Sequence, residues 1–282
     1  MTIQLRGPVT VERITELDDW PFGVREMFPA HPSDGPISLV IATHLVRTPD
    51  LTVLVDAGNG DGRHRPGLPA HHLLDAGYAA RLAARVAPEE IDVVVCSHLH
   101  PDHCGGLTTA DARPAFPGAR HLVSRAELAW LGAVHRSAPG SGVAEGLART
   151  WEDSVAPVLD AGLVDPVGDG DGDGDGVNVD VDLGHGVRLR AAPGHTPGHL
   201  VVEIGPPDGP EVVIGGDVLH HPLQFDDLDL AQAGDADPAR AARTRRDLCE
   251  RLARSGGLLL PSHFTPGRVR RAGDGFAYTP SP

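Results

Sequence analysis

The chain has 282 residues, of which 24 are basic and 39 acidic, so its formal net charge is −15. Affinity for a nucleic-acid backbone or an anionic membrane surface comes largely from Lys and Arg, so the acidic balance argues against both partners. No apolar run approaches the roughly 20 residues of a membrane-spanning helix. Residues 1–15 contain no apolar stretch typical of a secretory signal, and we therefore expect a cytoplasmic protein.

The N-terminal half predicts three antiparallel strands, then a helix and a further strand. Residues 9–17, 37–47 and 51–56 are rich in β-branched residues and separated by turn-forming residues. Apolar residues recur at helical spacing over 70–86, which predicts a helix before the strand at 92–96. A shorter helix is expected to start near Ser124, with Glu127 completing a capping box and Leu128 and Leu131 facing inward.

The C-terminal half predicts a second sheet. Its apolar runs at 187–192, 199–204 and 212–214 are short and strand-like, and they precede a helix at 238–254 and a strand at 258–261. No block of like charges separates the two halves. We therefore expect residues 1–282 to form one α+β domain with two sheets and outer helices.

An Asp/Gly tract at 168–182 partly matches a calcium-binding loop. Asp171, Asp173, Asp175 and Gly176 have the required spacing, but the twelfth position is Asp182 rather than a bidentate Glu. The tract has few apolar residues that would order it. The sequence favours a flexible acidic surface loop, with a calcium site as the alternative.

The three cysteines are too few and too scattered for a disulfide framework. Cys96 and Cys104 flank a histidine-rich motif, whereas Cys249 lies far along the chain. Nothing in the sequence pairs Cys96 or Cys104 with a base. We therefore expect small, buried, unreactive thiols.

Four candidate metal ligands directly follow the predicted strand at 92–96. His98 and His100 lie two residues apart and can point the same way, while Asp102 and His103 lie beyond Pro101 and can turn toward a second ion. Imidazole and carboxylate groups gathered at one point are what a divalent transition metal requires. The motif therefore predicts a metal site.

Three further candidate ligands lie at the ends of predicted strands. His195 stands in a Gly/Pro-rich turn, Asp217 follows the 212–214 strand, and His263 follows the last strand. A single histidine is more typical of a surface or a hydrogen-bonded core. Together with the first motif, the three residues favour ligation.

The complete pattern resembles the metallo-β-lactamase fold superfamily. Its motifs are His-x-His-x-Asp-His at 98–103, Gly-His-Thr-Pro-Gly-His at 194–199, Gly-Asp at 216–217 and the final His263. The resemblance implies an αββα sandwich with metals at the sheet edges. It assigns the ligands to two sites joined by one bridging carboxylate: His98, His100 and His195; Asp102, His103 and His263; and Asp217 between them.

The resemblance also implies a metal-dependent hydrolase with two divalent ions, for which zinc is the first expectation and Mn, Fe and Co are alternatives. Such a pair shares a bridging hydroxide that attacks the scissile bond. Asp102 is expected to be catalytic as well as a ligand, orienting the hydroxide and passing a proton to the leaving group. The substrate is expected to be a small molecule, and the protein a monomer or homodimer.

Segments at 9–14, 52–58, 192–199 and 216–225 resemble the branch that contains methyl parathion hydrolase and acyl-homoserine lactonase-like proteins. The stretch at 217–225 favours the former over the lactonases. That branch implies cleavage of a lactone, ester or phosphotriester. A polyketide-type thioesterase or cyclase of the same fold is the first alternative, and a mononuclear iron oxidoreductase is the second. The full ligand set favours hydrolysis, because a mononuclear iron site would leave Asp102, His103 and His263 unused.

Several other residues are candidates to support the ligands or line the substrate pocket. Asp56 is placed where the family often supports a ligand histidine. His199 is expected to brace its loop, while His220 and His221 follow the bridging aspartate. Phe225 is a candidate pocket residue. The remaining aromatic candidates for an apolar pocket wall are Trp20, Phe22, Phe28 and Trp130.

Overall fold

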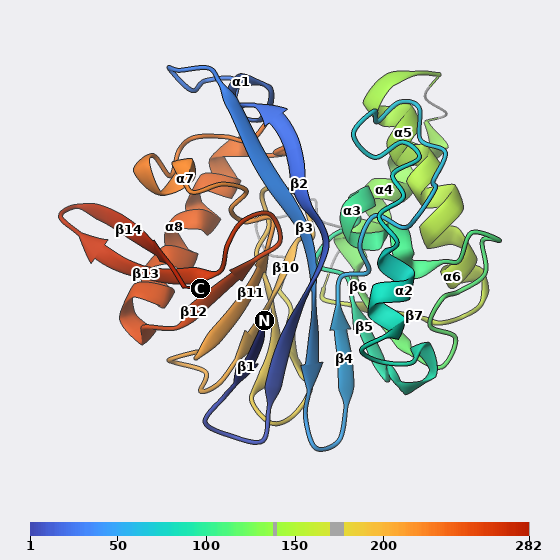
Figure 1. The fold of residues 1–282 in the computed structure, drawn as a ribbon, viewed down its shortest axis with the longest axis horizontal. Helices are drawn as coiled ribbons and strands as arrows, with labels where there is room; N and C mark the ends of the chain where they lie inside the picture. The colour runs from blue at the N-terminus through green and yellow to red at the C-terminus, as the bar shows by residue number, and fades with distance from the viewer. Residues whose placement is uncertain (138–139, 170–177, 282) are drawn as a thin grey trace. The chain divides into compact units, whose positions relative to one another are not determined.

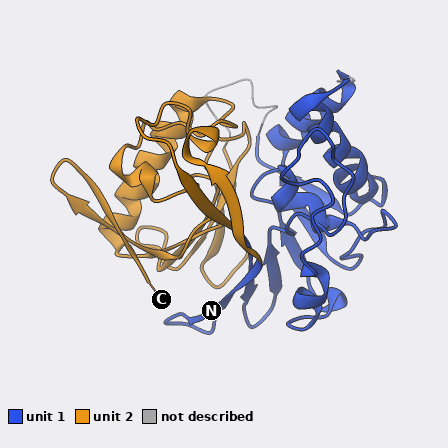
Figure 2. Cartoon of the chain, turned by 45° about the horizontal axis from the view of Figure 1, so that its top comes forward, with its two compact units in different colours: residues 1–16, 41–176 blue, residues 17–40, 177–282 orange. Residues whose placement is uncertain are grey.

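The computed structural model describes residues 1–137, 140–169 and 178–281. Most of the calcium-like tract, including Asp171, Asp173, Asp175 and Gly176, lies outside these residues. The chain forms two compact units (Figure 2). Unit 1 comprises residues 1–16 and 41–176, and unit 2 comprises residues 17–40 and 177–282.

The first sheet has seven strands in the order β1-β2-β3-β4-β5-β6-β7 (Figure 1). β3 and β4 pair antiparallel, whereas β4 to β7 are parallel. The strands are β1 (Thr2–Gln4), β2 (Thr10–Gly23), β3 (Pro36–Arg47), β4 (Thr52–Val55), β5 (Val93–Val95), β6 (Arg120–Ser124) and β7 (Val164–Val167). β2 and β3 contribute to both units, because unit 2 includes residues 17–40.

The helices of unit 1 lie beside β4 to β7 (Figure 1). They are α2 (Tyr78–Ala83), α3 (Pro101–Cys104), α4 (Arg125–Arg136), α5 (Gly142–Thr150) and α6 (Ala156–Asp160). Short 3-10 turns occur at Pro88–Glu90 and Gly105–Leu107, and a π-helical turn at Trp151–Val155 joins α5 to α6.

Unit 2 contains the second seven-stranded sheet, in the order β14-β13-β12-β11-β10-β9-β8. Its strands are β8 (Asp180–Asp182), β9 (Val187–Ala191), β10 (Leu200–Ile204), β11 (Val212–Gly216), β12 (Leu258–Pro261), β13 (Gly267–Ala272) and β14 (Gly275–Pro280). The helices of unit 2 are α1 (Val24–Met27), α7 (Leu223–Asp226) and α8 (Pro238–Ser255). All pairs are antiparallel except β11 with β12, which are parallel.

The two sheets and their flanking helices confirm the predicted α+β class. The predicted strands correspond to β2 to β5 and β9 to β12, and the predicted helix at 238–254 is α8. Among the described residues, no helix is both long enough and apolar enough to cross a bilayer.

The helix predicted at 70–86 is wrong in its first half, because α2 begins only at Tyr78. The Asp61 carboxylate accepts backbone N–H groups from Ala76 to Ala79 and so fixes the helix start there. Leu73 is exposed, and its left-handed φ of 54° is incompatible with an α-helix. A side chain distant in sequence therefore overrides the local periodicity.

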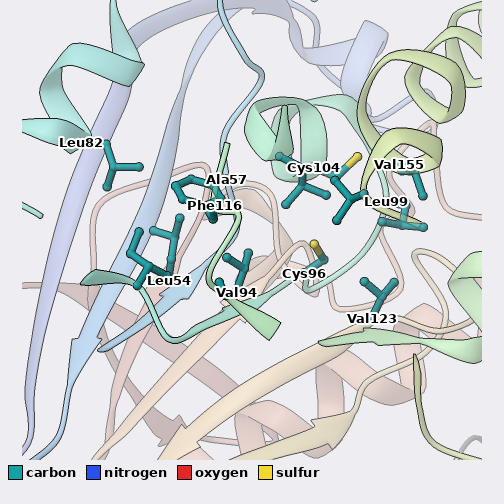
Figure 3. Packing of buried hydrophobic residues seen from close by; sticks show 14 of the residues in the cluster. Leu54, Ala57, Leu82, Val94, Cys96, Leu99, Cys104, Phe116, Val123 and Val155 are labelled. Atoms are coloured by element: carbon teal, nitrogen blue, oxygen red, sulfur yellow. The ribbon is translucent and has the colours of Figure 1, made fainter. Parts of the chain in front are cut away.

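The hydrophobic core of unit 1 lies between its sheet and its helices. Figure 3 shows Leu54, Val94 and Val123 from β4, β5 and β6 among its packed side chains. Cys96 and Cys104 belong to this core, and burial raises the pKa of both thiols above the ordinary range. Cys249 is buried in the core of unit 2. The prediction that the thiols are buried is confirmed. A raised pKa keeps a thiol protonated and so disfavours the nucleophilic thiolate.

The carboxylate of Glu16, on β2, is buried inside unit 1. Its Oε2 accepts the N–H of Asn59 at 2.8 Å, and its Oε1 has no hydrogen-bond partner among the described residues. Burial opposes ionisation more than that hydrogen bond favours it, and raises the pKa of Glu16 to about 8. The folded state therefore favours the protonated form of Glu16.

Replacing Glu16 should change stability in a pH-dependent way. The folded pKa lies above the ordinary 4.5, so the stability contributed by Glu16 is complete below pH 4.5 and is lost as the pH rises toward 8. In metal-free protein, Glu16→Gln should leave the free energy of unfolding nearly unchanged near pH 4.5. Near pH 9 it should raise that energy by a few kcal/mol, since each pKa unit is worth about 1.4 kcal/mol.

Denaturant titration at both pH values measures this difference. Glu89 on the surface provides the control, and Glu89→Gln should stay within about 0.5 kcal/mol of the wild type at both. An equal effect of Glu16→Gln at the two pH values would contradict a buried, protonated Glu16.

Candidate metal centre

The histidine motif of unit 1 follows the end of β5, a central strand of the sheet. β5 pairs in parallel with β4 on one side and β6 on the other. The loop that leaves it turns into α3 at Pro101, a residue suited to the first turn of a helix because it lacks an N–H. His98 and His100 thus lie in the loop, and Asp102 and His103 lie on α3.

The side chains of this motif lie close together and are largely buried. The ring centroid of His98 lies 4.7 Å from that of His100 and 4.1 Å from that of His103. Oδ2 of Asp102 is 3.4 Å from Nε2 of His103. The structure therefore brings together the four ligands predicted in unit 1.

Asp56 supports this cluster from the end of β4. Its Oδ2 is 2.9 Å from Nδ1 of His103, and its carboxylate accepts both the N–H and the hydroxyl of Ser97. Since an ionised carboxylate only accepts, the proton of neutral His103 lies on Nδ1 and its Nε2 lone pair is left for a ligand. Asp56 has a left-handed φ of 62°, a strained conformation that this network retains.

Glu127 is a supporting residue that sequence reasoning assigned to another role. The predicted N-cap Ser124 does accept the N–H of Ala126. The fully buried Glu127, expected to complete a capping box, accepts the N–H of Leu99 through its carboxylate at 3.1 Å. Leu99 lies between His98 and His100, so Glu127 fixes the backbone that carries both rings.

In unit 2, His195 lies in the turn between β9 and β10. Gly194 has a φ of 137°, and a Cβ there would lie 2.2 Å from the backbone nitrogen of Ala241 on α8, so only glycine fits. Nδ1 of His195 is 3.0 Å from Oδ1 of Asp235, whose Oδ2 lies 3.2 Å from Nη1 of Arg245. The close approach of Gly194 to α8 and the contact with Asp235 together hold the His195 ring in a fixed orientation.

Asp235 is a functional candidate that the sequence did not indicate. Burial opposes its ionisation, but the hydrogen bond from His195 and the nearby charges outweigh it and lower the pKa of Asp235 to about 2. Asp235 is therefore an anion that accepts the Nδ1 proton of His195. Its segment, Ala-Gly-Asp-Ala-Asp, has no periodic or motif signal that would have identified it.

Asp217 and His263 follow neighbouring strands, β11 and β12. Nε2 of His263 is 3.0 Å from Oδ1 of Asp217, and Nδ1 of His263 is 2.9 Å from the carbonyl oxygen of Val40. Nε2 of His195 is 3.5 Å from Oδ2 of Asp217. The structure therefore brings together the three ligands predicted in unit 2.

The hydrogen bonds of His195 and His263 leave the Nε2 lone pair of each ring facing an oxygen of the Asp217 carboxylate. Each ring donates Nδ1–H away from the cluster, so in the neutral ring the Nε2 lone pair points at a carboxylate. A second proton on each ring would remove this repulsion but would place two imidazolium rings in one buried site. A divalent cation between these Nε2 atoms and the Asp217 carboxylate would accept their lone pairs. The residues therefore fit a metal ion.

His220 also contacts Asp217, with Nε2 3.1 Å from Oδ2. Its Nδ1 has no hydrogen-bond partner among the described residues, and burial lowers the pKa of His220 to about 4. A neutral ring with its proton on Nε2 donates to Asp217 and leaves only a lone pair unsatisfied. As a metal ligand through Nε2, the ring would bury an unpaired N–H, which is more costly.

The other three supporting candidates have different surroundings. Nε2 of His199 accepts the N–H of Asp217 at 3.0 Å, which links the turn that carries His195 to the segment that carries Asp217. His221 accepts the N–H of Leu223. Phe225 stacks on Tyr278 in the core of unit 2, so its contacts give no support to the expectation of a pocket residue.

Comparison with protein families identifies the chain. Residues 36–263 match the metallo-beta-lactamase superfamily. The chain belongs to this superfamily. The match begins at β3 and ends at His263, and so includes all the ligands expected from the resemblance. No curated protein matches the chain in sequence.

Solved structures share this metallo-beta-lactamase fold. The hydrolase AbOPH of the beta lactamase superfamily is 22% identical, with a TM-score of 0.77 over 100% of this chain and 97% of that chain. AidC, a dizinc quorum-quenching lactonase in complex with a product, is 21% identical, with a TM-score of 0.75 and the same coverage. A probable metal-dependent hydrolase from Staphylococcus aureus is 18% identical, with a TM-score of 0.70 over 98% of each chain.

Replacing Asp235 should weaken metal binding without removing a ligand. Asp235→Asn keeps the side-chain volume but loses the charged acceptor of His195, so metal affinity should fall roughly ten- to a hundredfold. Competition with a chromophoric chelator measures the affinity. Asp229→Asn is the matched control, because the Asp229 carboxylate is exposed and pairs with Arg246. Equal affinities for the two variants would show that Asp235 does not orient His195.

Proposed function

We propose that this protein is a dinuclear metal-dependent hydrolase that cleaves a lactone, ester or phosphotriester bond in a small molecule. One ion would be held by His98, His100 and His195. The other would be held by Asp102, His103 and His263, and Asp217 would bridge the two.

The observation that carries this proposal is the orientation of three histidine rings. Nδ1 of His103, His195 and His263 each contacts an oxygen acceptor of the same unit at 2.9 to 3.0 Å. In each case Nε2 is thereby left for a ligand and lies within 3.5 Å of a carboxylate oxygen. This orientation through Nδ1 is typical of histidines that bind metals.

The same contacts favour two ions over one. A single iron held by the first set would leave His103 and His263 without a role. Yet Asp56 orients His103 at the cost of a strained backbone, and the Val40 carbonyl orients His263. We therefore place the dinuclear hydrolase ahead of the mononuclear iron oxidoreductase.

Two divalent ions, when bound, would lower the pKa of water to around 7 and polarise the oxygen of the scissile bond. The protein residues supply orientation and proton transfer. Asp102, which is 6% exposed, would accept a proton from the attacking water and return it to the leaving group. His220 would hold the Asp217 carboxylate in place by donating Nε2–H.

Aromatic side chains of unit 2 favour a substrate with an apolar group. The ring of Trp20 lies 6.1 Å from that of His263, and Phe22 packs edge-on against Trp20 at 4.8 Å. Both belong to the C-terminal part of β2. The lactonase AidC is described with N-hexanoyl-L-homoserine, which has such an apolar chain. An acyl lactone is therefore the first substrate to test.

Metal content tests the dinuclear site. Metal-reconstituted protein should contain two equivalents of zinc or manganese per chain, and His98→Ala or His263→Ala should lower that content by at least one equivalent. His64 is an exposed histidine outside the cluster, so His64→Ala should retain both. One equivalent of iron together with oxygen consumption would overturn the proposal.

Turnover tests the role of Asp102. The reconstituted protein should hydrolyse at least one member of a panel of acyl lactones, aryl esters, acyl thioesters and a phosphotriester. Asp102→Asn should lower kcat by roughly a hundredfold or more, the scale of general acid–base catalysis, because the amide cannot carry the proton. Unchanged kcat with both metals bound would exclude proton transfer by Asp102.

A further inference from the structure

Unit 1 contains a cavity that includes none of the predicted metal ligands. It has a volume of about 340 Å³ and lies between α2 and the segment from Gly106 to Phe116. Tyr78, Leu82 and Phe116, all largely buried, line its apolar part. Leu82 and Phe116 are labelled in Figure 3. The volume is within the range of small-molecule sites.

Arg63 contributes a positively charged side chain to the polar part of the cavity wall. Its guanidinium donates to the carbonyl oxygens of Thr108 and Thr109 and to the Thr108 hydroxyl, all of them neutral acceptors. Arg63 is 6% exposed, and its Nε has no hydrogen-bond partner among the described residues. A buried cation bound only to neutral groups is costly unless an anion joins it.

The carboxylates near Arg63 are already engaged. Asp153 makes two hydrogen bonds to the neighbouring Arg65, one to Nε and one to Nη2. Asp61 also lines the cavity, but its carboxylate accepts four backbone N–H groups at the start of α2. The positive end of that helix offsets its charge. One cationic group, Arg63, is left without an anionic partner in direct contact among the described residues.

The unbonded Nε lies beside the cavity wall at Gly60. A Cβ on Gly60 would lie 3.0 Å from Nε of Arg63 and 2.5 Å from the carbonyl oxygen of Gly105. Gly60 also has a φ of 76°, which a side chain would strain. Nε itself is buried, so a side chain at position 60 would press on the guanidinium. Gly60 and Arg63 both line the cavity.

We propose that this cavity binds a small amphipathic carboxylate, with its hydrocarbon part against Tyr78, Leu82 and Phe116 and its carboxylate at Arg63. An apolar wall with one buried guanidinium matches an aliphatic or aryl carboxylic acid better than a neutral or a highly charged ligand. The inference concerns a site separate from the proposed metal centre and does not rest on the proposed function.

The test uses octanoate as the probe with full-length, metal-free protein and isothermal titration calorimetry. Octanoate should bind, whereas octanamide, which lacks the charge, and acetate, which lacks the chain, should each bind at least tenfold more weakly. Arg63→Gln should weaken octanoate binding roughly ten- to a hundredfold, because hydrogen bonds to charged groups are the strong ones.

Two substitutions on α2 keep the test falsifiable if Arg63→Gln fails to fold. Ala83 and Ala80 are both exposed residues of this short helix, but only Ala83 lines the cavity. Ala83→Phe should fill the cavity and abolish octanoate binding, whereas Ala80→Phe should leave it unchanged. Binding that survives Ala83→Phe, or that does not distinguish octanoate from octanamide, would overturn the proposal.

A fourth variant, His98→Ala, separates this cavity from the metal centre. His98→Ala removes a predicted ligand and should not change octanoate binding to metal-free protein. Loss of binding in His98→Ala with retention in Ala83→Phe would place octanoate at the metal centre and would refute the cavity as its site. Failure of the cavity proposal would leave the metal-content and turnover tests unaffected.

Discussion

The hydrogen bonds at Nδ1 of three histidines determine what the candidate metal centre can do. A neutral imidazole carries one proton, so an acceptor at Nδ1 fixes that proton there and leaves the lone pair at Nε2. The acceptors differ chemically, being the carboxylates of Asp56 and Asp235 and the backbone carbonyl of Val40. Their effect is the same, and it is exerted within each unit separately: unit 1 orients His103, and unit 2 orients His195 and His263. The ring orientation therefore does not depend on a bound ion, and metal binding need not include the entropic cost of ordering these side chains.

This orientation is supported by costly features elsewhere in the fold. Asp56 keeps a left-handed backbone conformation, which costs on the order of 1–3 kcal/mol for a residue other than glycine. The side chains of Asp235 and Arg245 are fully buried together, and the desolvation of such a pair offsets much of its attraction. Glu127 is a buried carboxylate that accepts the backbone N–H of Leu99, between two of the histidines. None of these features is expected from stability alone. Their common position beside the histidines connects the strain and the buried charge to the site rather than to the core.

The sequence predicted the parts of the fold that depend on local pattern. The His98 to His103 motif, the β12 strand and α8 were found because residue type and spacing carry their signal. The helix predicted at 70–86 was wrong in its first half because Asp61, distant in sequence, fixes the start of α2. Asp235 and Glu127 were missed or misassigned because a carboxylate that reaches across the fold has no local pattern. The contribution of the Val40 carbonyl cannot be predicted from residue type, since every residue has a backbone carbonyl. Asp56 was expected only from the family resemblance. Candidate ligands thus have a clearer local signal than the groups that orient them.

The contrast between His220 and the predicted ligands shows why proximity alone does not identify a metal ligand. Asp217, His220 and His263 form a group whose ligand atoms lie close enough to share an ion. His263 has an acceptor at Nδ1 and so has Nε2 free of its proton, whereas Nδ1 of His220 has no partner among the described residues. The lower-energy arrangement of neutral His220 therefore places its proton on Nε2, facing Asp217. The rings of His220 and His263 stack with their centroids 5.5 Å apart, and both lie near the Asp217 carboxylate. Their different surroundings at Nδ1 indicate different roles. In the proposed dinuclear site, His263 would donate its lone pair to a cation. His220 would donate a hydrogen bond that fixes the Asp217 carboxylate between the two rings.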